Sequence, residues 1–312
     1  MNNNNTSATT TSPVLKMRSK KYWCSIDSSD VAVIVGLHKY NTDVFSLVMK
    51  YWMRSDYNDY NKTYDKIHVE PVEEIQTPET LIAQICKDVE NDIEEDTDEM
   101  FGDAIEDKIN EVCEIAKDDF KEFPNDKKLK ALAKIEPADV TSYCNKQMGI
   151  KLEKTAIERY EHEYNVKVDA LSNYVKKEFY ESNRIKWWIG GRVDGMIGID
   201  KVVEVKNRKN RLFDSVPIYE KNQLSTYMYS LNVTHGVLVQ MFKNIIKVQD
   251  THLDIGWFET VILNKLKKFC NFMDEFVCDD VLKDMFISID KTDKKRIEIH
   301  NTMLSYVVRL KG

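Results

Sequence analysis

The stretch that decides the fold is GGRVDGMIGIDKVVEVK, residues 190–206. In it an aspartate, Asp194, stands among apolar residues, and a predicted strand ending in Glu204, Val205 and Lys206 follows after a short connection. Side chains alternate across a strand, so Glu204 and Lys206 share one face while Val205 points into the opposite packing layer. The pattern therefore predicts two carboxylates and one ammonium group at a single point.

This combination suits divalent metal and phosphate chemistry. Asp194 and Glu204 offer oxygen ligands to Mg²⁺, which usually takes one or two carboxylates and keeps several waters. Lys206 would position or help deprotonate the attacking water, and the predicted reaction is phosphodiester hydrolysis. A simpler interpretation stays open, because Asp-Gly is a common hairpin turn and Glu-x-Lys on a strand is often a solvated ion pair.

Polar residues in two other segments strengthen the first interpretation. Gln223 and Tyr227 lie four residues apart, so they share one face of a predicted helix beside the strand. Upstream, Gly149 is expected to open a helix whose first turns direct Glu153 toward the strand ends. The complete set reads Glu, Asp, Glu-x-Lys and Gln-x-x-x-Tyr in chain order.

In this order the motifs resemble the PD-(D/E)XK nucleases of the RecB-type exonuclease branch. The pattern is most similar to the group that contains phage lambda exonuclease and the YqaJ-type viral recombinases. The segment SSDVAVIVGLHKY, residues 28–40, is similar to the Ser-Asp-x-Ala-x-x-x-Gly-x-x-x-Tyr signature of that group. The resemblance covers three blocks, at about residues 22–50, 148–165 and 186–243.

The resemblance implies a role for each matched residue. Metal binding falls to Glu153, Asp194, Glu204 and the Val205 carbonyl, and Lys206 becomes the catalytic lysine. Gln223 and Tyr227 would orient Lys206 or contact the substrate strand. Ser29 matches positions where a hydroxyl and the amides of a helix start hold a terminal phosphate, a task that helix N-termini perform well.

Several arginines near the motif are candidate phosphate contacts. Arg192-Val193 departs from the family pattern, which often has Ser or Gly followed by Pro, and Arg192 is either a phosphate clamp or a surface residue. Arg208 and Arg211 follow the strand in a short basic cluster and are expected to contact the nucleic-acid backbone. Such a cluster must focus attraction locally, because the net charge of the chain is −7.

The expected fold is α/β, with the mixed central sheet of a PD-(D/E)XK core flanked by helices. Residues 1–18 are expected to form a disordered tail and 19–312 the nuclease domain. An acidic helical subdomain is predicted as an insertion at about 66–135, since residues 70–122 hold twenty acidic residues and four lysines. Its apolar stripes are Leu81, Ile82, Ile85 and Val89, then Ile105, Ile109, Val112, Ile115 and Phe120.

Composition indicates a globular protein, with 42% hydrophobic and 31% charged residues. The sequence has neither a membrane-length apolar run nor a signal-peptide core, and its six scattered cysteines match no zinc or iron–sulfur spacing. These features predict reduced thiols and an intracellular location, cytoplasmic or nuclear, without secretion.

The resulting prediction is a Mg²⁺-dependent deoxyribonuclease, with Mn²⁺ as a substitute, that degrades duplex DNA from 5′ ends. The resemblance implies a single-strand annealing protein as partner and a ring-shaped homo-oligomer. Two alternatives remain: an endonuclease or RNA-degrading host shut-off nuclease of the same superfamily, and a catalytically silent nucleic-acid-binding subunit.

Overall fold

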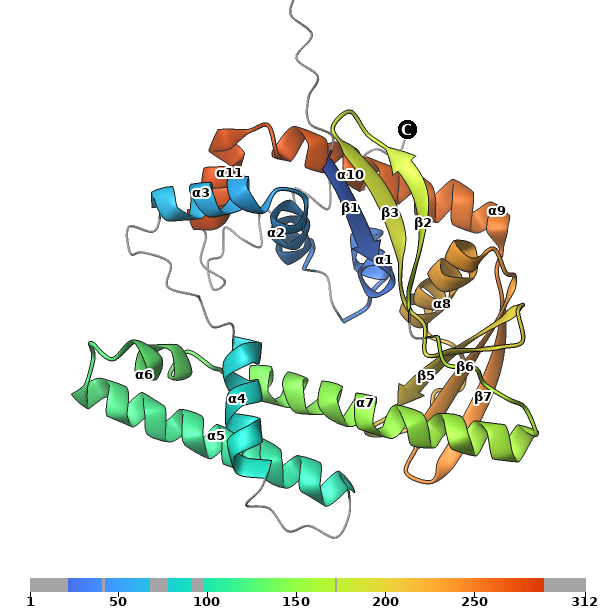
Figure 1. Cartoon of the computed structure of the whole chain (residues 1–312), viewed down its shortest axis with the longest axis horizontal. Coiled ribbons are helices and arrows are strands. Elements are labelled where there is room, and N and C mark those ends of the chain that lie inside the picture. Colours follow the sequence, from blue (N-terminus) through green and yellow to red (C-terminus); the bar gives the residue numbers. More distant parts are fainter. Residues whose placement is uncertain (1–21, 41–42, 68–77, 91–97, 172, 289–312) are drawn as a thin grey trace, which may run out of the picture.

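The chain folds as a mixed α/β protein in which β-sheets are flanked by helices (Figure 1). This computed structural model describes residues 22–40, 43–67, 78–90, 98–171 and 173–288. The predicted N-terminal tail lies outside the described residues. The predicted fold class is confirmed.

The first sheet has three strands in the order β1-β3-β2. Strand β1 (Tyr22–Asp27) pairs in parallel with β3 (Ile185–Arg192), and β2 (Tyr174–Glu181) pairs antiparallel with the other edge of β3. One face of this sheet is buried, as Trp187 and Ile189 of β3 are fully inaccessible to solvent.

The second sheet has four strands in the order β4-β5-β6-β7. The short β4 (Gly195–Ile197) is antiparallel to β5 (Lys201–Asn207), β5 is parallel to β6 (His235–Phe242), and β7 (Ile245–His252) forms a hairpin with β6. Only two residues separate β3 from β4, so the chain passes from one sheet to the other at Asp194. The sequence predicted one central sheet; the strands are instead divided between two.

Helices cover the buried face of the three-stranded sheet. They are α1 (Ser28–Ile34), α2 (Val44–Ser55) and the continuous run of α9 (Ile255–Trp257), the π-helical segment η1 (Phe258–Leu263) and α10 (Asn264–Phe276). Aromatic rings dominate the contact, with Tyr51 of α2 edge-on to both Trp187 and Phe269. Such T-shaped pairs add to the free energy gained by burial.

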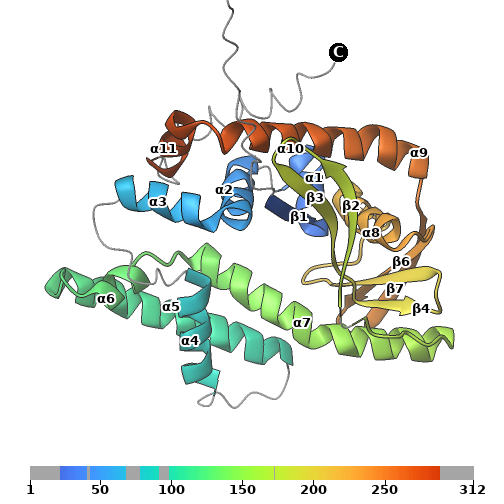
Figure 2. The same ribbon diagram turned by 45° about the horizontal axis from the view of Figure 1, so that its top comes forward.

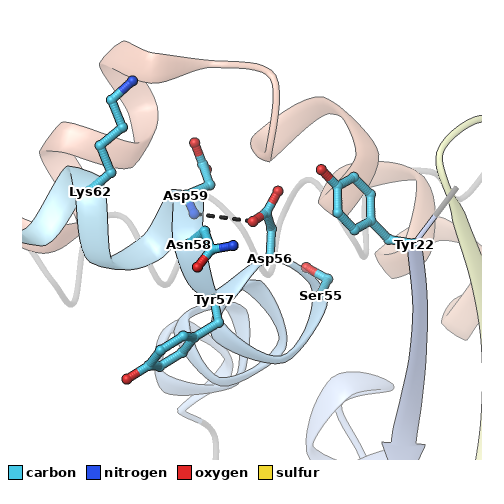
Figure 3. Close-up of a pocket in the computed structure, with 7 residues that line it drawn as sticks. All are labelled: Tyr22, Ser55, Asp56, Tyr57, Asn58, Asp59 and Lys62. Atoms are coloured by element: carbon cyan, nitrogen blue, oxygen red, sulfur yellow. Dashed lines mark hydrogen bonds between the residues drawn. The ribbon is translucent and has the colours of Figure 1, made fainter. Parts of the chain in front are cut away.

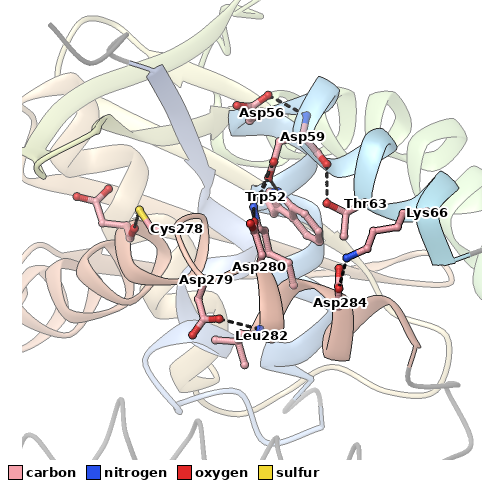
Figure 4. Close-up of polar contacts among 12 residues, drawn as sticks. Trp52, Asp56, Asp59, Thr63, Lys66, Cys278, Asp279, Asp280, Leu282 and Asp284 are labelled. Carbon is pink, nitrogen blue, oxygen red and sulfur yellow. Dashed lines mark hydrogen bonds and ion pairs between the residues drawn. The ribbon is translucent and has the colours of Figure 1, made fainter. Parts of the chain in front are cut away.

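Polar contacts fix the last described helix, α11 (Asp280–Ser288), onto α3 (Tyr57–Ile67) (Figure 4). Lys66 pairs with Asp284, and the buried Lys283 binds Asp59 at 3.0 Å. Asp59 also accepts a hydrogen bond from the indole of Trp52, which joins α11 to the main core. Among the described helices, none combines the length and the apolarity that crossing a membrane requires.

The four-stranded sheet lies between two helices. Val203, Val205 and the neighbouring β6 valines pack on α7 (Pro137–Tyr164), through Ala156 and Tyr160. On the other face Val202 packs on α8 (Ile218–Leu231), in a cluster that also includes Val193. Both helices end at an asparagine in the left-handed conformation, Asn165 after α7 and Asn232 after α8.

A helical unit adjoins this core, built from α4 (Pro78–Glu90), α5 (Asp98–Glu122), α6 (Lys127–Leu132) and the first half of α7 (Figures 1 and 2). These helices enclose an apolar cluster of their own. Of the predicted stripe on α5, Ile105 and Ile109 are buried but Ile115 is 54% exposed. The prediction for Ile115 was wrong because the buried stripe continues through Cys113 and Ala116, at spacings of four and three.

The start of α7 also differs from the prediction. The helix begins at Pro137, twelve residues before Gly149, with Pro at its first position and a capping box between Glu136 and Asp139. These signals outweigh one internal glycine, whose cost in a helix is only about 1 kcal/mol. As a result α7 runs from the helical unit to the four-stranded sheet, where it carries Glu153 (Figure 2).

Candidate active site

The predicted aspartate occupies the junction of the two sheets. Asp194 lies between the end of β3 at Arg192 and the start of β4 at Gly195. Its Oδ2 atom accepts a hydrogen bond of 2.7 Å from the Val205 amide. Because the N–H and C=O of one strand residue point to the same side, the Val205 carbonyl also faces this edge of β5. Asp194 and the end of β5 are thus held together.

Strand β5 presents Glu204 and Lys206 on one face, as strand alternation predicts. The Glu204 side chain is 2% exposed, and its Oε1 atom accepts a hydrogen bond of 2.5 Å from Nζ of Lys206. Its second oxygen, Oε2, is buried and has no hydrogen-bond partner among the described residues. A buried polar atom without a partner is costly, and a bound cation would satisfy it.

The carboxylates of this corner resist ionisation in the absence of a cation. Burial raises the pKa of Glu204 to about 8, although the ammonium group of Lys206 opposes the change. Burial also raises the pKa of Asp194, against the hydrogen bond from the Val205 amide. The pKa of Lys206 is raised because the attraction of Glu204 outweighs the effect of burial.

Glu153 approaches the corner from α7. Its side chain is half-buried, and its pKa is raised first by burial and then by the negative charge of Asp194, while Arg192 and Lys206 act in the opposite sense. These electrostatic interactions show that Glu153, Asp194, Arg192 and Lys206 surround one region. Arg192 itself is exposed at the end of β3.

Gln223 and Tyr227, the two predicted site residues of α8, lie on the side of the four-stranded sheet that carries Glu204. Gln223 donates a hydrogen bond of 3.0 Å to the Tyr227 hydroxyl, as their spacing of four residues predicts. Burial raises the pKa of Tyr227 and the nearby Glu204 raises it further, whereas hydrogen bonds with Ser28 and Gln223 lower it. Tyr227 therefore remains a neutral phenol that links α8 to the start of α1.

A glycine allows this close approach. A Cβ atom added to Gly191 would lie 2.5 Å from the Ser28 hydroxyl oxygen and 2.8 Å from Cε1 of Tyr227. Ser28 is buried in this contact and Ser29 is exposed beside it. Sequence reasoning selected Ser29 and missed Ser28, because two adjacent serines at a helix start cannot be ranked before the packing of α1 on α8 is known.

The structure gives Arg208 a different environment from the one predicted. Its guanidinium group makes two parallel bonds of 2.6 Å to the Glu220 carboxylate and a third of 2.8 Å to Gln240. The Arg208 side chain is 10% exposed and that of Glu220 4% exposed, so this guanidinium is not available as a free phosphate contact. Arg211 is exposed in the loop that follows and remains a candidate.

Sequence reasoning also missed Glu220. Glu220 lies three residues before Gln223, so the two share one side of α8, and through Arg208 it ties this helix to the end of β5. The available signal was an acidic residue in the first turn of a predicted helix, close in sequence to an arginine-rich loop. This signal did not show which arginine Glu220 would bind.

These residues fit a divalent cation, although they do not enclose one. Among the described residues, no three His, Cys, Asp or Glu side chains form a group that could hold a metal ion. Mg²⁺, however, needs only one or two carboxylates besides its waters and substrate oxygens. Asp194, the unpartnered oxygen of Glu204 and the Val205 carbonyl meet that need.

None of these residues lines either of two surface pockets formed by the described residues. One pocket lies where β1 starts beside the α2–α3 junction, and Figure 3 shows Tyr22, Asp56 and Asp59 among the residues around it. The other is formed near Arg184 and Asp274. The candidate active site lies instead where the chain passes from one sheet to the other at Asp194.

The mixed α/β fold and the arrangement of Asp194, Glu204 and Lys206 agree with the resemblance to the PD-(D/E)XK class. The chain belongs to the YqaJ-like viral recombinase domain family, whose profile matches residues 15–243. Comparison with curated proteins found no match.

Solved structures of exonucleases show a distant likeness. An alkaline exonuclease from Laribacter hongkongensis is 15% identical, with 43% of this chain and 70% of that chain covered and a TM-score of 0.35. A phage-related exonuclease from Haemophilus somnus is 10% identical over 86% of this chain and 96% of that chain, also with a TM-score of 0.35. Membership of the family rests on the sequence match over residues 15–243.

Proposed function

We propose that this protein is a metal-dependent deoxyribonuclease that hydrolyses phosphodiester bonds at the corner formed by Asp194, Glu204 and Lys206. The observation that carries the proposal is the buried, unpartnered Oε2 atom of Glu204 beside the ammonium group of Lys206. A fold maintains such an uncompensated carboxylate at a cost, which a cation would offset. Family membership supports the same reading.

In this proposal Asp194, Glu204, the Val205 carbonyl and Glu153 hold Mg²⁺, with Mn²⁺ as a substitute. The ion would lower the pKa of a bound water and neutralise charge on the transferring phosphate. Lys206, an ammonium group with a raised pKa, would orient that water by donating a hydrogen bond to it and would stabilise negative charge on the phosphate. Its partner Glu204 keeps the ammonium group at a fixed place on β5.

The α8 residues support the lysine and the substrate strand. Gln223 and the neutral Tyr227 fill the space behind Glu204 and exclude bulk water from it. Arg192 and Arg211 contact backbone phosphates, and Ser29 with the α1 amides contacts a terminal phosphate. Arg208 has a positioning role, since it fixes the end of β5 to α8 through Glu220.

We further propose that the enzyme is an exonuclease that degrades duplex DNA in the 5′ to 3′ direction inside the cell, during viral or phage-type recombination. A recombinase family fits resection that leaves a single strand, which an annealing protein would then receive. A homo-oligomer that encloses the duplex is part of this proposal. The acidic helical unit at about 66–135 is proposed as an insertion in the nuclease domain.

The test is a cleavage assay with Mg²⁺ on four substrates. They are linear duplex with 5′-phosphate, the same duplex without it, covalently closed circular DNA, and single-stranded RNA. Degradation of linear duplex alone, stimulated by the 5′-phosphate and abolished by Lys206→Ala, is the expected result. Cleavage of circles or RNA would assign an endonuclease or an RNA-degrading nuclease instead, and binding without cleavage under any metal would assign a silent subunit.

A further inference from the structure

The three-stranded sheet buries only one of its faces. Directly paired residues on neighbouring strands point their side chains to the same side. The strand registers place Trp23 beside Lys186 and Tyr174 beside Arg192. Lys176 is paired with Gly190, which lies two residues after Trp188 and therefore on the same face of β3. We name this surface the aromatic sheet face, and it consists chiefly of Trp23, Trp188, Tyr174, Lys176, Lys186 and Arg192.

Two of the three aromatic side chains of this face are exposed to solvent. Trp23 is 68% exposed and Tyr174 is 44% exposed, while Trp188 is half-buried. None of the three belongs to an apolar cluster formed by the described residues. The next residue of β3, Trp187, is by contrast fully buried on the other face. Three large rings on one open sheet face form a surface suited to a partner with flat, apolar faces.

Cations are interleaved with the rings. The ammonium group of Lys176 lies 5.7 Å from the ring centre of Trp23 and 5.1 Å from that of Trp188. Lys186 is half-exposed, and its ammonium group forms an ion pair of 2.8 Å with Glu178. Among the described residues, Lys176 and Arg192 have no carboxylate at ion-pair distance. In a chain of net charge −7, these cations mark a local site for an anionic partner.

The face is continuous with the candidate active site. Arg192 ends β3 on this face, and its positive charge acts on Glu153 and Asp194. Asp194 lies six positions after Trp188, a distance of about 20 Å along an extended chain. A strand that crossed the rings along β3 would therefore arrive at the carboxylates.

We propose that the aromatic sheet face binds single-stranded DNA, with bases stacked on Trp23, Trp188 and Tyr174 and phosphates contacted by Lys176, Lys186 and Arg192. Unpaired bases expose their flat faces to such rings, whereas bases in a duplex stack on one another. The proposal deepens the proposed nuclease function, because the strand would be the one that enters or leaves the active site. Binding itself does not require cleavage.

The experiment measures binding in EDTA, where metal-dependent cleavage cannot occur. Fluorescence anisotropy with a labelled oligothymidylate gives the dissociation constant of the full chain and of two variants, Trp23→Ala and Lys176→Glu. Phe123→Ala and Lys121→Glu are matched controls, since Phe123 is 60% exposed and the Lys121 side chain is 76% exposed on the helical unit. Both face residues are exposed, so the variants are expected to fold.

The expected result is a weaker complex for both face variants and an unchanged one for both controls. Loss of one stacked base predicts a dissociation constant about 5- to 150-fold higher for Trp23→Ala. A duplex of equal length should compete poorly for the site, and its own binding should be indifferent to Trp23→Ala.

Equal binding by wild type and both face variants would overturn the proposal. A loss of the same size for duplex as for single strand would overturn it in favour of a duplex contact. A change in sedimentation of Trp23→Ala, with unchanged oligonucleotide binding, would assign the face to contacts between copies. Failure of the nuclease proposal is distinct, because it would show as intact DNA after incubation of wild type with Mg²⁺.

Discussion

Replacing Glu204 by glutamine separates the metal-site account from a purely structural one. The substitution keeps the shape of the side chain and an acceptor for Lys206 but removes the buried negative charge. A structural ion pair would be weakened by the change. A carboxylate retained for a cation would instead leave a metal-free protein that is more stable without its charge.

The magnitude follows from the pKa. An ordinary glutamate has a pKa of 4.5, and burial raises that of Glu204 to about 8. A carboxyl with a raised pKa contributes stability that is fully present below pH 4.5 and is lost as pH rises through about 8. Since each intervening pH unit is worth about 1.4 kcal/mol, the ionised group costs the metal-free protein at most about 5 kcal/mol.

Urea unfolding in EDTA between pH 5 and pH 9 measures this effect. Relative to wild type, Glu204→Gln should gain stability steadily toward pH 9. Addition of Mg²⁺ at about 100 times its dissociation constant should stabilise wild type by about 2.7 kcal/mol and the variant by much less. Glu158→Gln on exposed α7 surface is the control and should change little at any pH. A variant no more stable than wild type at pH 9, or one that keeps the full Mg²⁺ effect, would refute the reasoning.

Three further substitutions test neighbouring parts of the account. Arg208→Ala should lower the free energy of unfolding by about 3–5 kcal/mol, because it leaves Glu220 buried and unpaired. Urea denaturation measures this loss, and a much smaller loss would contradict the positioning role of Arg208. Gly191→Ala should reduce cleavage strongly, since the new methyl group would displace Tyr227; near-normal activity would show that this contact is not needed. Gly149→Ala should stabilise the protein by about 0.5–1 kcal/mol in thermal unfolding, as nothing lies within 4 Å of the added atom.

The local geometry of the site could be predicted because it depends on short-range periodicity. Strand alternation placed Glu204 and Lys206 on one face, and a spacing of four residues brought Gln223 to the hydroxyl of Tyr227. Both relations are set by backbone geometry within a single element. They need no knowledge of how elements pack.

Features that depend on packing between distant elements were not predictable in this way. Arg208 was assigned to phosphate because it leaves the strand beside the predicted metal site, yet its partner Glu220 is determined by the docking of α8 beside β5. The choice between Ser28 and Ser29 likewise depends on α1 lying against Tyr227. The division into two sheets follows from the end of the β3 ladder before Asp194, and the motif itself carries no signal for it.

Cleavage of end-labelled linear duplex DNA by wild type and two lysine variants tests the central claim most directly. Lys206→Ala removes the proposed catalytic lysine, and Lys201→Ala removes a half-exposed lysine of the same strand that pairs with Asp250 on β7. With Mg²⁺ present, we predict a rate about 10² to 10⁴ times lower for Lys206→Ala, a nearly normal rate for Lys201→Ala, and no cleavage in EDTA. Equal rates for Lys206→Ala and wild type, or cleavage that persists in EDTA, would contradict the account.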